Sequence, residues 1–151
     1  MTAILEGASL AARTELLGRW DDELLLGGVM LSEWATFLIQ DADVAFCAGA
    51  DLAALLTAQA AMEAHLKHQY GDTPEARPGF AQLIDTSPLP PELRRRLHEV
   101  RRYRNRWVHV RDPDEDSHLI ERPDRHRSEL SLMSTRAMRL LREVIYLDQF
   151  V

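Results

Sequence analysis

The chain has 151 residues, among them 17 arginines, one lysine and 24 acidic residues, and its net charge is −6. This length fits one domain, and a hydrophobic share of 46% is enough to form a buried core. A single cysteine excludes a disulfide scaffold and a cysteine-based zinc site. No apolar run approaches the roughly 18–20 residues of a membrane span, and the first residues do not resemble a signal peptide. We therefore expect one soluble, cytoplasmic domain over residues 1–151 that does not contact a membrane.

Charge is unevenly distributed along the chain. Residues 1–92 carry 4 basic and 14 acidic side chains, a net charge of −10, whereas residues 93–151 carry 14 basic and 10 acidic side chains, a net charge of +4. Eight of the arginines fall between Arg94 and Arg111. This basic segment is compatible with a surface that binds phosphate, and equally with a solvated helix face.

Helix signals dominate the first half of the chain, where strand signals are nearly absent. Gly27 and Gly28 end the first helix, Ser32 caps the second, Asp51 caps the third, and Gly71 stops it. The predicted helices cover residues 10–26, 33–48 and 52–70.

The second half continues the helical pattern. A proline-rich stretch, residues 86–91, suits the start of a helix that has proline in its first turn, and Asp124 is expected to cap the last helix. The predicted helices cover residues 80–85, 91–109 and 124–146, and residues 111–123 are expected to form an acidic loop. Helices joined by short loops predict an all-α fold, an antiparallel bundle of about five helices.

Two charged residues fall on apolar helix faces. Glu63 lies within the apolar stripe of the 52–70 helix, one turn before Leu66, and Arg104 lies between Val100 and Trp107 on the apolar face of the next long helix. A lone buried charge costs several kcal/mol, so each of the two needs a partner. We expect Glu63 and Arg104 to pair inside the bundle or at its mouth. Such a pair either fixes the register of the helices or orients the arginine for phosphate chemistry.

The opposite face of the 91–109 helix is rich in groups that bind phosphate and transfer protons. Arginine offers a rigid fork of donors to phosphate, and histidine titrates near neutral pH. The face carries His98, Arg102, Asn105 and His109, flanked by Arg95 and Arg106. Polar outward faces are ordinary, so this pattern alone is a weak signal.

The run from Arg102 to His109 resembles the signature of HEPN-domain proteins, in particular bacterial HEPN and abortive-infection-like proteins. In that signature an arginine is usually followed by a polar residue, and a histidine comes after four to six intervening residues. Arg104, Asn105 and His109 fit with four intervening residues, and Arg102 fits with six. The resemblance covers roughly residues 33–147, and the all-helical setting agrees with it.

The resemblance implies a metal-independent endoribonuclease that needs no cofactor and acts as a homodimer on RNA. The ribose 2′-OH attacks the adjacent phosphate and leaves a 2′,3′-cyclic phosphate. His109 transfers protons, Arg104 stabilises the transition state, and Asn105 orients His109 or a phosphate oxygen. Glu63 positions Arg104. The expected RNA-backbone contacts are Arg95, His98, Arg102, Arg106 and Arg111.

The resemblance leaves the activity and its setting open. In a regular helix Arg104 and His109 lie about 140° apart, so they converge only if the helix ends near Trp107 or if they act across a dimer. One interpretation is a toxin or phage-defence effector. The alternative is a catalytically inert HEPN-like module that binds RNA or a protein partner, for example a nucleotidyltransferase antitoxin. A third is a structural helical dimer in which the Glu63–Arg104 pair sets the register.

No residue pattern predicts a metal site. His65 and His68 are three residues apart and Glu63 is expected to face inward, whereas a helical metal site usually has histidines at i and i+4 and a third ligand elsewhere.

Overall fold

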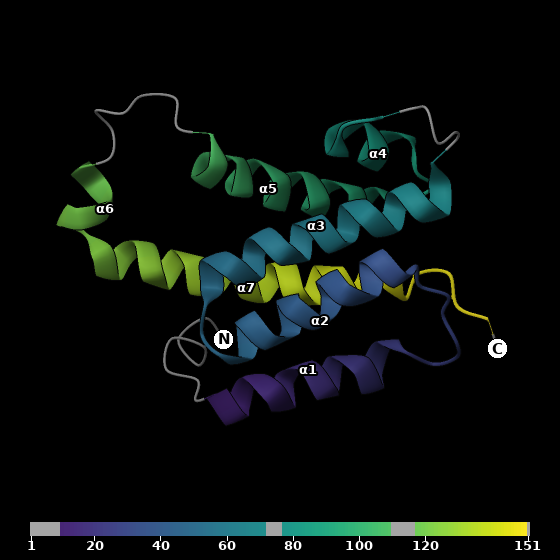
Figure 1. The fold of residues 1–151 in the computed structure, drawn as a ribbon, viewed down its shortest axis with the longest axis horizontal. Coiled ribbons are helices and arrows are strands. Elements are labelled where there is room, and N and C mark those ends of the chain that lie inside the picture. Colours follow the sequence, from purple (N-terminus) through teal and green to yellow (C-terminus); the bar gives the residue numbers. More distant parts are fainter. Residues whose placement is uncertain (1–9, 72–76, 110–116, 151) are drawn as a thin grey trace.

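The computed structural model describes residues 10–71, 77–109 and 117–150. Its described residues form an all-α fold with seven helices (Figure 1). The helices are α1 (Leu10–Leu24), α2 (Glu33–Cys47), α3 (Asp51–Tyr70), α4 (Phe80–Thr86), α5 (Pro91–Val108), α6 (Ser117–Glu121) and α7 (Pro123–Ile145).

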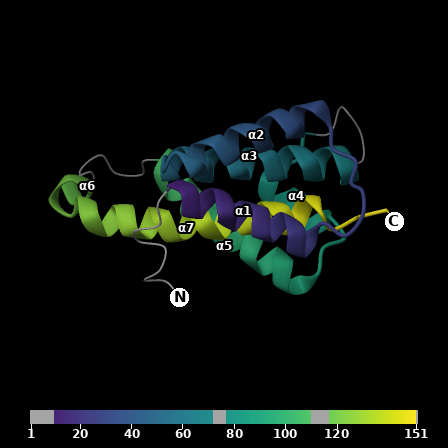
Figure 2. The same cartoon turned by 90° about the horizontal axis from the view of Figure 1, so that it is seen from below.

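The long helices run lengthwise and in alternating directions, as expected for an antiparallel bundle (Figure 1). The most extensive packing joins α2 to α3 and α3 to α7. Seen from below, α2 and α3 lie along one side of the molecule, and α5 begins on the opposite side and slants across the bundle (Figure 2). The predicted all-α bundle is therefore confirmed, with two short helices among the seven.

Most helix boundaries follow the local sequence signals. The Ser32 side chain accepts a hydrogen bond from the Ala35 backbone N–H, as an N-cap does. Gly49 ends α2 with φ 79°, in the left-handed region that glycine adopts without strain. Proline occupies the first turn of α5, and the helix ends at Val108. The predicted starts and ends of these helices are confirmed to within about two residues.

Three local predictions are wrong. Asp51 is the first residue of α3 and does not cap it, because Ala50 precedes the helix and the Asp51 carboxylate accepts hydrogen bonds from Arg13 and Ser134. Asp124 likewise lies in the first turn of α7, whose preceding residue is Arg122. The stretch predicted as an acidic loop contains α6 within its described part.

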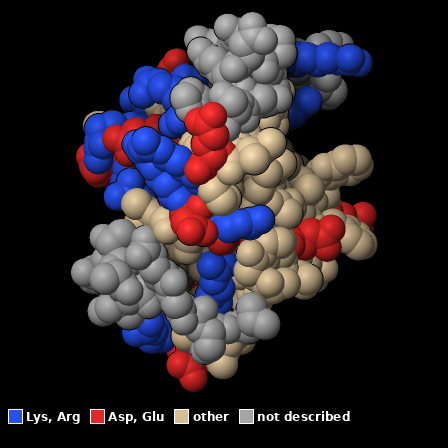
Figure 3. All heavy atoms as spheres, turned by 90° about the vertical axis from the view of Figure 1, so that its left-hand side faces the viewer, with Lys and Arg blue, Asp and Glu red and all other residues tan. Residues whose placement is uncertain are grey.

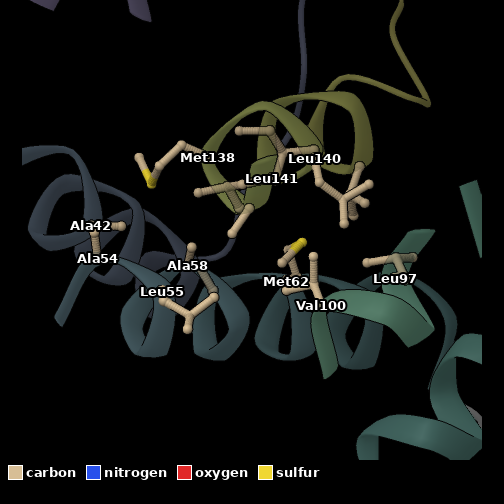
Figure 4. Close-up of a cluster of buried hydrophobic side chains, with 14 of the residues drawn as sticks. Ala42, Ala54, Leu55, Ala58, Met62, Leu97, Val100, Met138, Leu140 and Leu141 are labelled. Atoms are coloured by element: carbon tan, nitrogen blue, oxygen red, sulfur yellow. The ribbon is translucent and has the colours of Figure 1, made fainter. Parts of the chain in front are cut away.

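The core combines small alanine side chains with larger leucine, valine and methionine side chains. Alanines of α2 and α3 are fully buried where these helices meet, and leucines and methionines of α3, α5 and α7 fill the space between them (Figure 4). The labelled set comprises Ala42, Ala54, Leu55, Ala58, Met62, Leu97, Val100, Met138, Leu140 and Leu141. Each fully buried leucine or methionine contributes about 1.5–3 kcal/mol to folding.

The α1–α2 connection is tied to the C-terminal segment. Gly28 and Phe150 exchange two backbone hydrogen bonds of 2.7 and 2.9 Å. A Cβ atom at position 28 would lie 2.6 Å from the Phe150 ring, so a larger residue there would have to displace this exposed ring. This contact anchors the start of α2.

Candidate nucleic-acid interface

Helix α5 is amphipathic and carries the candidate site on its outer side. Leu93, Leu97, Val100 and Tyr103 are buried, and they face α7, α3 and α4. The arginines and histidines between them lie on the flanks and the outer side of the helix, half-buried or exposed. Figure 3 views the end of the molecule where α5 finishes, and it shows basic side chains gathered along one side and mostly uncharged residues along the other.

Not every arginine of α5 is available for a ligand. The Arg94 guanidinium donates hydrogen bonds of 3.2–3.3 Å to the backbone oxygens of Ile84, Ser87 and Leu89, at the end of α4 and just beyond it. These carbonyls lack helical partners, so Arg94 satisfies the end of α4. Arg96 is bidentate to Glu143 on α7. Both arginines hold α5 to its neighbours.

A shallow basic groove of about 320 Å³ runs along α5, lined by Pro91, Arg94, Arg95, His98 and Arg102. Arg95 forms ion pairs with Glu92 and Glu99 on its own helix. These glutamates neutralise much of its charge, although both pairs are exposed and exchange readily with solvent. Arg95 therefore lies on the predicted face with its charge already partnered.

The His98 ring is held on both sides. Arg101 donates a 3.2 Å hydrogen bond to Nδ1, and Nε2 lies 2.7 Å from an Asp85 oxygen. Because arginine only donates, Nδ1 must accept, so Nε2 carries the hydrogen that Asp85 accepts. His98 thus lines the groove with both ring nitrogens already hydrogen-bonded to Asp85 and Arg101.

Arg102 differs from its neighbours. Its side chain is exposed on the groove, and among the described residues it forms no ion pair. It is the arginine of this groove that has the fewest competing partners for an anionic ligand.

The three signature residues lie together at the C-terminal end of α5. The helix ends at Val108, and His109 has left helical geometry with φ −118° and ψ 90°. Its backbone N–H donates to the Asn105 carbonyl at 3.0 Å, while its side chain is exposed. The expected end of the helix near His109 is confirmed. Within the described chain, no hydrogen bond joins the His109 side chain to Arg104 or Asn105.

Arg104 is half-buried and incompletely partnered. Its Nη1 donates a 3.4 Å hydrogen bond to Asn105 Oδ1, and its buried Nε has no partner among the described residues. The expected Glu63–Arg104 ion pair is absent from the described side chains. The reason is the placement of α5, which packs more extensively on α7 and α4 than on α3. The register-fixing role that rested on this pair is therefore wrong within one chain.

Arg106 and Tyr103 form the other edge of the helix end. The Arg106 guanidinium lies 5.5 Å from the Tyr103 ring centre, a cation–π contact, and 3.6 Å from Glu129 of α7. Burial raises the pKa of Tyr103 to about 12. Tyr103 therefore stays protonated at neutral pH and is a poor proton acceptor. Arg111, the remaining predicted RNA contact, lies outside the described residues.

Two buried arginine networks were missed by the sequence analysis. Arg142 of α7 is 3% exposed, donates two hydrogen bonds to Asp43 and lies 2.9 Å from Asp21, which accepts a hydrogen bond from Tyr146. Asp43 belongs to α2 and Asp21 to α1. This network joins three helices through one guanidinium.

The second network centres on Arg13, which pairs with Asp51 and donates a 2.9 Å hydrogen bond to the Phe46 carbonyl. Its guanidinium also lies 4.6 Å from the Phe46 ring centre. Arg13 lies one turn before the buried Leu17 and shares its helix face. A charge on an apolar face is the pattern that singled out Glu63 and Arg104, and the same pattern identifies Arg13 in the first helix.

His65 is the buried histidine of α3, and its Nδ1 has no partner among the described residues. Burial lowers the pKa of His65, and the nearby His68 lowers it further. Within the described ranges, no three His, Cys, Asp or Glu side chains gather in a group that could hold a metal ion.

Comparison with protein-family models, with curated proteins and with solved structures finds no match for this chain. None of the helices in the described part of the chain is long and apolar enough to cross a bilayer.

Proposed function

We propose that the protein is a HEPN-type endoribonuclease that works without a metal ion and acts at the C-terminal end of α5. The observation that carries this proposal is the state of three neighbouring residues. His109 is exposed just after the helix end, Asn105 lies one turn earlier, and the half-buried Arg104 keeps a donor without a partner. A proton-transfer group, an amide and an incompletely paired guanidinium are what phosphodiester cleavage by an internal hydroxyl requires.

The chemistry follows from these groups. His109 in its neutral form removes the proton from the ribose 2′-OH, whose oxygen then bonds to the adjacent phosphorus. Arg104 stabilises the added negative charge on the phosphorus centre. The bond from phosphorus to the 5′-oxygen breaks, and that oxygen takes up a proton. The products are a 2′,3′-cyclic phosphate and a 5′-OH.

One histidine cannot remove and deliver a proton at the same moment, so the reaction calls for two acid–base groups. A second copy that brings its own His109 to the same phosphate supplies the other group. This requirement supports a homodimer in which two α5 ends face each other. Such a dimer would also bring an arginine of one copy close to a histidine of the other, which does not happen within the described part of one chain. Arg102 holds the RNA backbone along the groove.

The alternative function is an inert HEPN-like module that binds RNA or a protein partner such as a nucleotidyltransferase antitoxin. A specific observation favours it. The His109 side chain has no described contact with Arg104, and Arg95 and His98 are engaged with other side chains. Such a module needs the exposed arginines but not their alignment with His109.

Incubation of the purified chain with structured RNA in EDTA separates the two functions. We expect cleavage that leaves cyclic phosphates, identified by mass spectrometry of the ends, and loss of cleavage in His109→Ala. His68→Ala, which changes an exposed histidine on α3, is the matched control and should cleave like the parent. Equal cleavage by His109→Ala and the parent, or no cleavage by the folded parent, would overturn the nuclease.

A further inference from the structure

A second and larger groove lies on the side of the bundle where α1 and α5 flank α7. Its volume is about 990 Å³. Its apolar lining includes Leu16 and Trp20 of α1, Val100 of α5, and Met133 and Leu140 of α7. A hollow of this size with an apolar floor is typical of sites that take up large side chains.

The rim of this groove is basic, and part of that charge has no internal partner. Arg96 and Arg139 form ion pairs with Glu143 and Glu23. Arg19 and Arg136 also line the groove and are exposed. Neither has a carboxylate partner among the described residues, since the contact found for Arg136 is a 3.9 Å approach to the Met133 sulfur. The groove therefore offers two free cations beside an apolar floor.

Helix α2 carries the complementary surface. Its inner side is formed by Ala35, Ala42 and Phe46, all fully buried. On its outer side Trp34 and Phe37 are 76% and 72% exposed, and Val44 is 68% exposed two turns later. Large aromatic side chains are seldom left so exposed in a row unless something covers them.

The charges on α2 distinguish between possible occupants. Glu33 and Asp41 lie beside the exposed aromatic residues, and α2 contains no lysine or arginine. Pairing α2 with α2 of another copy would bring these acids together, which is unfavourable. The Arg19–Arg136 rim offers them the opposite charge. The groove of a second copy therefore suits α2 better than its own face does.

We propose that α2 of one copy docks into the α1–α5–α7 groove of a second copy. Trp34 and Phe37 enter the apolar floor, and Glu33 and Asp41 meet Arg19 and Arg136. Helix α2 lies on the side of the molecule opposite the first turns of α5 (Figure 2). The α5 residues that line the groove belong to this first part of the helix. The contact is therefore heterologous, so a pair keeps a free groove on one copy and a free α2 face on the other, and association continues into rings or chains.

Sedimentation of the full-length chain over a wide concentration range tests this contact. One variant, Trp34→Glu with Phe37→Glu, changes the face of α2, and the other, Arg19→Glu with Arg136→Glu, changes the groove. We expect the mass of the parent to rise with concentration. Each double variant should weaken association by at least about 30-fold, as for interface hot spots. An equimolar mixture should form pairs that do not grow further, because one variant keeps an intact groove and the other an intact face.

Matched controls are Ile120→Glu, which alters another exposed apolar residue, and Arg127→Glu, which reverses an exposed arginine elsewhere on α7. Both should associate like the parent. Circular dichroism checks that each variant is folded. If the α2 variant unfolds, Trp34→Ala replaces it, and if the groove variant unfolds, Arg136→Ala replaces it. None of these residues belongs to the proposed nuclease site, so failure of this contact leaves that proposal intact.

Three results would overturn the proposal. The parent stays at one mass at every concentration, the groove variant associates like the parent, or the mixture fails to associate. A groove variant that behaves like the parent while the α2 variant does not would mean that α2 binds a different surface.

Discussion

Arg142 and Arg104 are the same residue type in two contrasting settings. Arg142 is almost fully buried, and its guanidinium contacts two carboxylates from different helices. Arg104 is half-buried near the end of α5, donates a long hydrogen bond to its neighbour and leaves a buried Nε without a partner. Nε of Arg142 likewise makes no hydrogen bond, but it lies 2.9 Å from an Asp21 oxygen and its charge is paired, whereas Nε of Arg104 has neither kind of partner among the described residues.

The contrast extends to the groups around each arginine. The Arg142 network bridges α1, α2 and α7, so its loss affects three helices at once. The surroundings of Arg104 are local, since Asn105 and His109 belong to the same helix and its end. Paired arginines therefore act in folding here, and incompletely paired arginines are the candidates for binding and catalysis.

The largest expected effect on activity is at Arg104. Arg104→Lys keeps the charge but loses the planar fork of donors, so we expect the rate of RNA cleavage to fall about 10²- to 10³-fold. The free energy of unfolding should change little, because the residue has no ion pair in the described chain. Cleavage at saturating RNA measures the first quantity and urea unfolding the second. A variant that cleaves normally would remove Arg104 from the site.

Arg142→Leu should have the opposite profile. Removing the guanidinium leaves Asp43 and Asp21 facing each other without a cation, and we expect a loss of about 3–5 kcal/mol in the free energy of unfolding. Cleavage per folded molecule should stay near that of the parent. Urea denaturation monitored by circular dichroism measures the loss.

Arg139→Ala is the matched control on the same helix. Its ion pair with Glu23 is more exposed, so its removal should cost no more than about 1 kcal/mol. Equal losses from the two substitutions would show that the buried network contributes no more than a surface pair.

Arg102→Ala tests whether an arginine without an ion pair binds RNA. Loss of one phosphate contact should weaken RNA binding and reduce the slope of log affinity against log salt by about 0.7 for single-stranded RNA. Cleavage at saturating RNA should be largely retained. Binding measured over a range of salt concentrations gives the slope, and an unchanged slope would place the RNA elsewhere.

The smallest expected effect concerns pH and His65. Because the folded state lowers its pKa below the ordinary 6.5, the unfolded chain takes up a proton there first as the pH falls. The contribution of His65 to stability is therefore present above about pH 6.5 and is lost progressively below it. Unfolding measured from pH 8 to pH 5 should show a smaller decline in His65→Gln than in the parent. His68→Gln, at an exposed position, is the control and should keep most of the parent's decline.

Several features of the fold were readable from local sequence. Ser32, Gly49 and Pro91 mark helix boundaries through caps, a left-handed residue and a first-turn proline, and each acts within a few residues of itself. Hydrophobic spacing identified the buried side of α5, because residues one turn apart on a helix share a face. The end of α5 lies within one residue of its predicted position at His109.

The partners of charged side chains were decided by the tertiary structure. Arg13 meets Asp51 and Arg142 meets Asp43, 38 and 99 residues apart, and no local pattern specifies such a pairing. Glu63 and Arg104 both lie on faces that the sequence reads as apolar, yet α5 packs mainly on α7 and α4 and leaves them apart. The groove between α1, α5 and α7 likewise exists only once three helices are assembled. Helix positions are set by short-range periodicity and caps. Charge pairing and grooves depend on how whole helices pack, and no local pattern in the sequence specifies that packing.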